Sequence, residues 1–234
     1  KLNKINIFVS LQKNICMAKK KSITREQLVS KYMETVLEEG RPASVYSFTK
    51  ANQLTETDFY NFYGNFDALE EDIFHTFLQS SIDLIEKSEE YAVFDTRNKL
   101  LTFYYTFFEI LKANRSYIMA SLNSDTNRLQ NLKKLSSMRS EFKDFIGHLE
   151  WDLMDLKQEK INKIQRNSVE EGAWIQLLLT LKFWLDDSSA SFEKTDIFIE
   201  KSVHATFDLL SVKPLQSILD LGKFLVKEKL NYKA

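Results

Sequence analysis

The N-terminal part of the chain carries short amphipathic runs separated by turn signals. In residues 24–39, apolar side chains recur at the three- and four-residue intervals that place them on one face of a helix. Thr24 and Gln27 have the spacing of a capping box, in which two side chains bind free backbone amides at a helix N-terminus. Gly40 follows the last apolar position and is a residue type that ends helices. The pattern therefore predicts a helix over residues 24–39.

Two shorter runs follow this helix. Residues 44–51 form one of them, which breaks at Asn52 and Gln53. Residues 55–63 form the other, and Thr55 is placed to cap it. Two short helices joined by a tight turn and braced by a longer helix are the helix-turn-helix plan, in which the second short helix can enter the DNA major groove.

Residues after 67 show longer helical patterns. The runs with helical periodicity cover residues 68–90, 100–112, 116–122, 128–160, 168–186, 195–212 and 214–229. Five glycines and two prolines in 234 residues leave little material for the tight turns of an all-β fold. The sequence therefore predicts an all-α protein in which a three-helix helix-turn-helix head precedes a larger C-terminal helical domain.

Residues 40–69 resemble the N-terminal signature of the TetR family of bacterial transcriptional regulators. That signature places a glycine, a buried apolar pair, a capped turn and an aromatic-rich helix at fixed spacing. The positions that match without a gap are Gly40, Val45, Phe48, Thr49, Leu54, Thr55, Phe59, Tyr60, Phe62, Tyr63, Asn65, Asp67 and Leu69. The resemblance implies a DNA-binding domain over residues 22–66 and a ligand-binding and dimerisation domain over 67–234, with residues 1–21 as an extension or a flexible basic arm.

Positive charge is scarce in the region that resembles the DNA-binding head. Residues 22–70 contain four basic and eight acidic side chains, a net charge of −4, whereas DNA affinity depends largely on cations that neutralise phosphates. The lysine that the family places at the start of its fourth helix corresponds to Phe66 here, and the family's turn glycine corresponds to Gln53. The basic cluster at residues 19–21 raises the net charge to −1, and it is either an arm that lies along phosphates or a solubilising start of the chain.

The candidate contacts to a double-stranded DNA operator are polar residues of the two short helices, their caps and the upstream basic cluster. They are Lys19, Lys20, Lys21, Ser44, Lys50, Thr55, Glu56, Thr57, Tyr60 and Asn61. Thr57 and Asn61 are expected nearer the bases. Ser44, Lys50 and Tyr60 are expected to position the phosphate backbone, which carries no base information.

The second short helix begins with two acidic residues, Glu56 and Asp58. One interpretation is that they complement the helix dipole in the first turn. The other is that an acid accepts a hydrogen bond from cytosine N4 in the major groove. Neither role replaces the missing phosphate contacts.

The long helices of the C-terminal domain are unusually rich in aromatic residues. Members of the TetR family commonly hold an effector between these helices, so the resemblance implies a small hydrophobic ligand, which the sequence does not identify. The alternative is that an aromatic stripe at helical spacing is ordinary core. The candidate ligand-binding residues are Phe103, Tyr104, Phe107, Tyr117, Phe142, Phe145 and Trp174.

Residues 173–185 are apolar around most of the helix circumference, so they must be covered on more than one side. By the resemblance, this helix and residues 195–210 pair with their twofold mates in a homodimer. The alternative is complete burial within one subunit. The candidate interface residues are Trp174, Leu178, Leu181, Leu185, Phe198, Val203 and Leu209.

Catalysis finds little support in the sequence. His75, His148 and His204 are isolated, with no second histidine or cysteine at metal-ligand spacing. The sequence has no glycine-rich phosphate loop, nucleophile elbow or H-E-x-x-H motif. The acidic pair Asp186 and Asp187 is expected to be a solvated helix end. We therefore predict a non-enzyme with no cofactor and no bound metal.

The N-terminal segment and the cysteine content bear on location. The apolar centre of residues 1–16 is too short for a transmembrane helix and is not followed by a signal-peptide cleavage site. These residues are expected to precede a natural start at Met17; the alternative is an arm that packs on a partner. The single cysteine, Cys16, excludes an intramolecular disulfide and fits a reducing compartment, so we expect a cytoplasmic protein without membrane contact.

Two functions are consistent with these features. The first is a ligand-responsive DNA-binding repressor, in which effector binding moves the helix that links head and body and so changes the half-site spacing. The second is a protein with the TetR fold whose degenerate head no longer reads DNA and which binds a lipid-like molecule or a protein partner. The lipid-binding accessory protein of ubiquinone biosynthesis, which shares this fold, is a precedent for the second. Helix spacing and caps favour the first function, whereas the acidic second helix and Phe66 favour the other.

Overall fold

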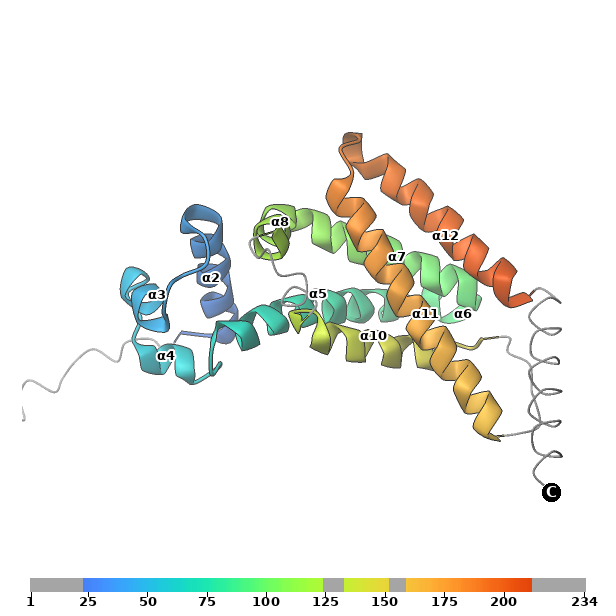
Figure 1. The fold of residues 1–234 in the computed structure, drawn as a ribbon, viewed down its shortest axis with the longest axis horizontal. Helices are drawn as coiled ribbons and strands as arrows, with labels where there is room; N and C mark the ends of the chain where they lie inside the picture. Colours follow the sequence, from blue (N-terminus) through green and yellow to red (C-terminus); the bar gives the residue numbers. More distant parts are fainter. Residues whose placement is uncertain (1–22, 124–132, 152–158, 212–234) are drawn as a thin grey trace, which may run out of the picture. The chain divides into compact units, whose positions relative to one another are not determined.

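A computed structural model of the chain describes residues 23–123, 133–151 and 159–211 (Figure 1). Within these ranges all regular secondary structure is helical. The chain divides into two compact units, residues 1–66 and residues 67–234. The predictions for residues 1–21 and 214–229 lie outside the described residues.

The described part of unit 1 contains three helices, and each begins with a capping box. They are α2 (Arg25–Glu39), α3 (Val45–Ala51) and α4 (Glu56–Tyr60). The predicted capping box of α2 is confirmed, because the Gln27 amide donates to Thr24 Oγ1 at 3.3 Å and the Thr24 amide donates to Gln27 Oε1 at 3.1 Å. Ser44 and Thr55 cap α3 and α4 in the same way. Local side-chain chemistry therefore sets where all three helices begin.

Four buried aromatic rings form the core of unit 1. Phe66 packs against Tyr32, Phe48 and Phe59, with ring centroids 5.2, 5.9 and 5.3 Å away. Tyr32 and Phe48 also meet edge to face, at 5.8 Å. Aromatic pairs at this spacing stabilise a core beyond their area burial. Phe66, which occupies the position of the family's lysine, is therefore part of the hydrophobic core.

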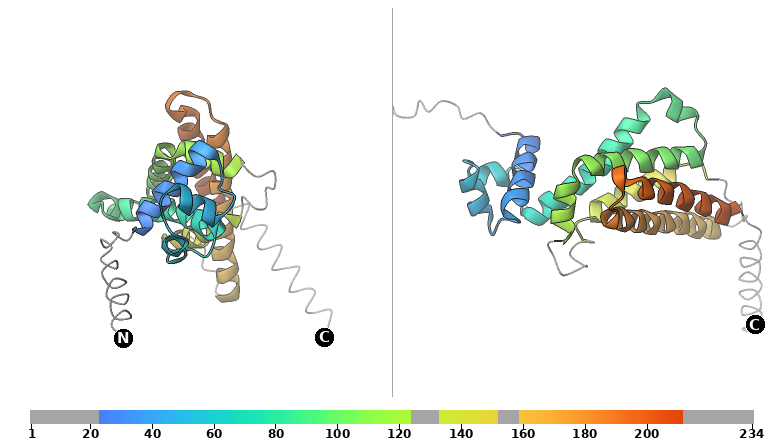
Figure 2. Two further views of the ribbon diagram at one scale, coloured as in Figure 1. Left: turned by 90° about the vertical axis from the view of Figure 1, so that its left-hand side faces the viewer. Right: turned by 90° about the horizontal axis from the view of Figure 1, so that it is seen from above.

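The described part of unit 2 consists mostly of longer helices. They are α5 (Phe66–Glu86), α6 (Glu89–Val93), α7 (Thr96–Ala113), α8 (Arg115–Asn123), α10 (Ser136–His148), α11 (Glu159–Asp186) and α12 (Glu193–Ser211), with a 3₁₀ turn, η1 (Ala190–Phe192), before α12. α10 packs on α11, and α12 packs on both α7 and α11 (Figure 2). None of the helices in the described ranges combines the length and apolar character needed to span a lipid bilayer.

Two predicted helix boundaries are wrong. Residues 128–160 do not form one helix, because α10 ends at His148. Trp151 folds back instead: its indole N–H donates to the Ile146 carbonyl at 2.8 Å, and its ring stacks on Phe207 with the centroids 5.2 Å apart. These contacts with α10 and α12 accompany the end of a run whose periodicity alone indicates a longer helix. α11 also begins well before residue 168, at Glu159.

A second correction concerns Asp187, which is buried and is not part of a solvated helix end. Its Oδ2 accepts hydrogen bonds from the amide and hydroxyl of Thr195 at 3.0 and 2.7 Å. Its Oδ1 accepts from the amide and hydroxyl of Ser189 at 2.8 and 2.7 Å. Desolvation raises the pKa of Asp187, but these four hydrogen bonds outweigh it and lower the pKa to about 2. The carboxylate therefore stabilises the connection between α11 and α12.

Arg115, at the start of α8, binds the C-terminal end of α11. Its guanidinium donates to the carbonyls of Trp184, Leu185 and Asp187 at 2.8, 3.1 and 3.3 Å. The same group lies over the rings of Trp184 and Phe192, 4.3 and 4.5 Å from their centroids. A cation at these carbonyls satisfies groups that have no partner within the helix.

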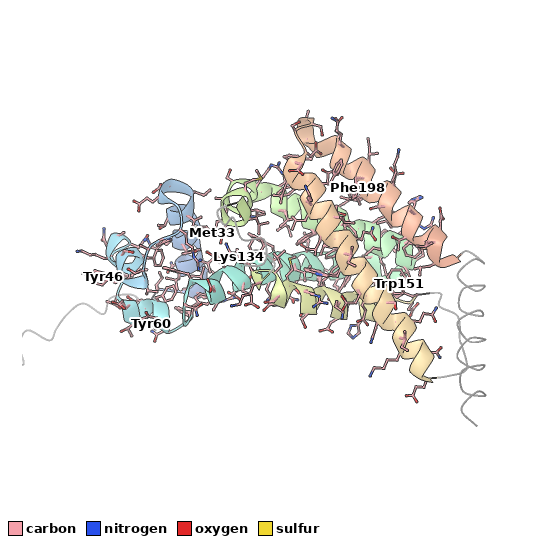
Figure 3. All side chains as sticks on the ribbon, viewed as in Figure 1. Met33, Tyr46, Tyr60, Lys134, Trp151 and Phe198 are labelled. Atoms are coloured by element: carbon pink, nitrogen blue, oxygen red, sulfur yellow. The ribbon has the colours of Figure 1, made fainter. Side chains whose placement is uncertain are left out.

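One buried ion pair joins three segments of unit 2. Lys134, labelled in Figure 3, places its ammonium 3.1 Å from Glu70 Oε2, and the two side chains are only 5% and 3% exposed. The ammonium also donates to the Ser121 carbonyl at 2.9 Å. The first turn of α5, the end of α8 and the segment before α10 therefore meet at a desolvated charge.

Candidate nucleic-acid interface

The turn between α3 and α4 is held by hydrogen bonds to α2 and to α3. The Asn52 side-chain amide donates to the Phe48 carbonyl at 3.0 Å and to Thr35 Oγ1 of α2 at 3.2 Å. The Leu54 amide donates to the Thr49 carbonyl at 2.8 Å. The break predicted at residues 52–53 is confirmed, and the turn is fixed in place relative to α2.

Gln53 has a left-handed backbone conformation, with φ of 58°. This is the position at which the family signature has glycine. A residue with a Cβ pays roughly 1–2 kcal/mol in that conformation, whereas glycine adopts it freely. The turn therefore holds a residue with a Cβ in a conformation that glycine adopts more easily.

Changing Gln53 to Gly should stabilise the head locally. We expect Gln53→Gly to be about 1 kcal/mol more stable than Gln53→Ala, because alanine keeps the unfavourable Cβ. Hydrogen exchange of the amides in α3 and α4 measures this effect, and about 1 kcal/mol corresponds to roughly fivefold slower exchange. Equal exchange rates in the two variants would show that the turn is not strained.

The exposed side chains of α4 share one helix face. Thr57, Tyr60 and Asn61 are spaced three and four residues apart and are all exposed, with Tyr60 52% accessible. Lys50 of α3 and Glu56 of α4 are exposed as well. These five predicted contact residues are accessible to a partner, whereas Lys19, Lys20 and Lys21 lie outside the described residues.

Three polar residues at the helix starts have structural roles. Ser44 Oγ accepts a hydrogen bond from the Ser47 amide at 3.1 Å, and Thr55 Oγ1 accepts from the Asp58 amide at 3.2 Å. The Asp58 carboxylate in turn accepts from the amide and hydroxyl of Thr55 at 2.8 and 2.7 Å. Helix capping therefore explains Asp58, while Glu56 stays a candidate contact.

The end of α4 is tied to the start of α2. Tyr63 is buried, and its hydroxyl accepts a hydrogen bond from Arg25 Nε at 3.1 Å. Phe62, which replaces a tyrosine of the family signature, is partly exposed. Of Phe62 and Tyr63, only Tyr63 carries a hydroxyl, and this hydroxyl stabilises the fold of the head.

The seven predicted ligand-binding residues are all buried in unit 2, where most of their rings pack on one another. Phe103 lies 4.8 Å from Phe145, 5.3 Å from Phe142 and 5.6 Å from Phe107, between ring centroids. Trp174 extends the cluster, 6.2 Å from Phe142. This dense packing agrees with the alternative interpretation, in which these aromatic residues form an ordinary hydrophobic core.

Tyr104 is the exceptional member of the predicted ligand set. Its side chain is fully buried, and its hydroxyl has no hydrogen-bond partner among the described residues. Burial raises the pKa of the Tyr104 hydroxyl above its ordinary value. An unpaired buried donor costs free energy, so this hydroxyl is a place where a polar group of a ligand would be favoured.

A separate cavity of about 480 Å³ lies between the end of α10 and the first half of α11. Its lining includes Trp151, Arg166 and Glu170, and none of the seven predicted ligand residues belongs to it. The cavity is therefore more polar than the hydrophobic site that the sequence predicts.

Unit 2 also presents an apolar surface on α11 and α12. Trp174, Leu181 and Val203 are buried within the subunit, so these three residues of the predicted dimer seam do not face outward. Leu178 and Leu185 are half-buried. The outer α11–α12 face is defined by five exposed side chains, together with the half-buried Phe198 that stacks on one of them: Ile175, Leu179, Phe183, Ile197, Leu209 and Phe198. The sequence could not separate inward from outward side chains here, because the periodicity of an all-round apolar helix does not reveal its rotation, and the seam itself stays a prediction.

A helix-turn-helix head followed by a separate helical body defines a class of transcriptional regulators. Residues 99–225 match the family described as tetracyclin repressor-like, C-terminal domain. The match covers more than half of the chain, and the chain belongs to the TetR family, as the resemblance of residues 40–69 indicates.

The fold is also found in a solved structure. A protein from Syntrophomonas wolfei, assigned to the TetR-family transcriptional regulators, superposes with a TM-score of 0.59 over 81% of this chain and 97% of its own length. The two sequences are 14% identical, so the likeness concerns the fold. No curated protein matches the chain. The all-α fold with a head and a larger body is thereby confirmed.

Proposed function

We propose that this regulator is a homodimer that binds operator DNA through its head, acts as a repressor and responds to a small hydrophobic effector. The observation that carries the proposal is the α3–α4 pair, in which capped helices and a fixed turn present Thr57, Tyr60 and Asn61 on one exposed face. A rigid pair of this kind can place side chains against base edges without a further ordering cost.

The outer α11–α12 face supports the proposal of a dimer. The rings of Phe183 and Phe198 stack there with their centroids 4.6 Å apart, and Leu179 and Ile197 are about half exposed beside them. A second copy of the chain is the occupant that suits a continuous apolar face on two adjacent helices. The dimer would bring two heads to two half-sites of one operator.

The effector response is proposed to act through the aromatic core of unit 2. A hydrophobic ligand would have to open the cluster around Phe103, because its rings contact one another directly. Tyr104 offers that ligand one buried polar partner. An apolar molecule with a single hydrogen-bonding group therefore suits the site best.

Selection of genomic DNA fragments by the purified full chain at low salt tests DNA binding. We expect enrichment of a two-fold symmetric sequence with half-sites about one helical turn, or a multiple of it, apart. Tyr60→Phe should weaken binding without changing the preferred sequence, since a phosphate contact carries no base information. Thr57→Ala and Asn61→Ala should instead relax the preference at single base pairs.

The opposite result favours the second function. If no fragment binds better than random DNA, with or without candidate effectors, the repressor proposal fails. Glu56, the few cations and the buried Phe66 then favour a head that does not read DNA. Mass spectrometry of lipids that copurify with the chain would distinguish a lipid-binding protein from one that binds a protein partner.

A further inference from the structure

The helix-turn-helix pair carries a single basic residue. Between residues 44 and 63 this residue is Lys50, while Glu56 and Asp58 are acidic. Among the described residues, no ion pair involves Lys50. Any phosphate contact that α3 and α4 make through a cation therefore depends on where this one ammonium group is held.

Tyr46 lies one helical turn before Lys50 on α3. Lys50 Nζ is 5.6 Å from the centroid of the Tyr46 ring, within the range of a cation–π interaction. Tyr46 is 58% exposed, and Figure 3 labels it at the surface of the head. The sequence prediction of DNA contacts did not include this residue, although the four-residue spacing of Tyr46 and Lys50 on a predicted helix is a signal that indicates such a pair.

The first turn of α3 holds Tyr46 in position. The Ser47 amide donates to Ser44 Oγ at 3.1 Å, and the Ser44 amide donates to Ser47 Oγ at 3.2 Å, which completes a capping box on either side of Tyr46. A free lysine side chain samples many rotamers, and this freedom is lost when the ammonium group binds. A ring that restricts the side chain beforehand reduces the cost of ordering it on binding.

We propose that Tyr46 is a positioning residue whose ring holds the Lys50 ammonium at the outer surface of α3, where the pair contacts a phosphate of the operator. The inference rests on the proposed DNA-binding function. It assigns the ring of Tyr46, and not its hydroxyl, to this task. It also gives the acidic head a preorganised contact on α3 with the phosphate backbone of the DNA.

The salt dependence of binding to the selected DNA fragment tests this proposal. Lys50→Met should lower the slope of log K against log salt by about 0.9 per subunit. Tyr46→Leu keeps the charge but removes the ring, so it should weaken binding about twofold to fivefold per subunit without changing the preferred sequence. Tyr46→Phe keeps the ring and should bind like the unmodified protein.

Two further comparisons separate positioning from other roles. In the Lys50→Met background, Tyr46→Leu should have no additional effect. Lys99→Met is the matched control, because it removes a charge from another lysine–tyrosine pair, with Nζ 5.9 Å from the Tyr91 ring, in unit 2. This control should leave the slope unchanged.

Each contrary result is informative. Normal binding by Tyr46→Leu, or an effect that adds fully to that of Lys50→Met, would overturn the proposal. Weakening by Tyr46→Phe equal to that by Tyr46→Leu would assign the contact to the hydroxyl and overturn it as well. If the unmodified chain binds no DNA, this inference falls together with the proposed function; if the chain binds DNA and the variants do not respond, only this inference falls.

Discussion

Leu179→Asp should convert the proposed dimer into a folded monomer. Leu179 lies on the outer α11–α12 face and is 55% exposed within one subunit, so the substitution removes few contacts within that subunit. At a twofold interface each subunit would bury one unpaired carboxylate. An uncompensated buried charge costs roughly 3–5 kcal/mol, and the symmetry doubles the cost.

Sedimentation velocity at micromolar concentration measures this effect, and circular dichroism verifies that the helices persist. Leu84→Asp is the matched control, because Leu84 is 56% exposed on α5 and lies outside the outer α11–α12 face. It should leave the dimer intact. The dimer proposal is wrong if the unmodified chain sediments as a monomer, or if both variants dissociate to the same extent. Loss of operator binding by Leu179→Asp would further connect the dimer to the two half-sites.

Lys134→Met should destabilise unit 2 by roughly 3–5 kcal/mol, because it leaves the Glu70 carboxylate buried without its cation. Lys134 also loses its hydrogen bond to the Ser121 carbonyl. Replacing both charges, in Lys134→Met with Glu70→Leu, should recover most of the loss, since apolar side chains can replace a buried pair at little cost. The single and double variants together measure the coupling between the two residues.

Urea denaturation followed by tryptophan fluorescence measures this stability. Trp151, Trp174 and Trp184 all belong to unit 2, so the signal reports that unit. Lys112→Met is the control, because Lys112 pairs with Glu109 at the surface, where such a pair contributes at most about 1 kcal/mol. A loss in Lys134→Met no larger than in this control would contradict the role of the buried pair. A double variant as unstable as the sum of its parts would do so as well.

The head shows how far local chemistry can be read from the chain. Thr24, Ser44 and Thr55 each bind an amide three residues further on, so the starts of α2, α3 and α4 depend on neighbours in sequence. The break at residues 52–53 is local in the same sense. For that reason the order of elements in the helix-turn-helix pair could be predicted from the sequence. The resemblance to the TetR signature rests on that order.

The candidate contacts on α3 and α4 were predictable in part. Spacing placed Thr57, Tyr60 and Asn61 on one face, and the structure leaves all three exposed. The structure gives the two acidic residues of α4 different roles: Asp58 caps its own helix, whereas Glu56 takes no part in the described capping boxes. Tyr46 was missed although it lies four residues before Lys50 on a predicted helix, a spacing that places the two side chains on one face.

By itself the sequence determined an all-helical protein with a capped helix-turn-helix head, because helix periodicity, caps and turns depend on residues within a few positions of one another. Only the tertiary structure decided that Phe66 fills the core of the head, that Trp151 turns the chain back onto Phe207, and that Asp187 is buried. Only the tertiary structure, too, decided which side of α11 faces outward. Each of these outcomes depends on a partner that is distant in sequence or on the rotation of a helix, and the apolar pattern of a single segment contains neither.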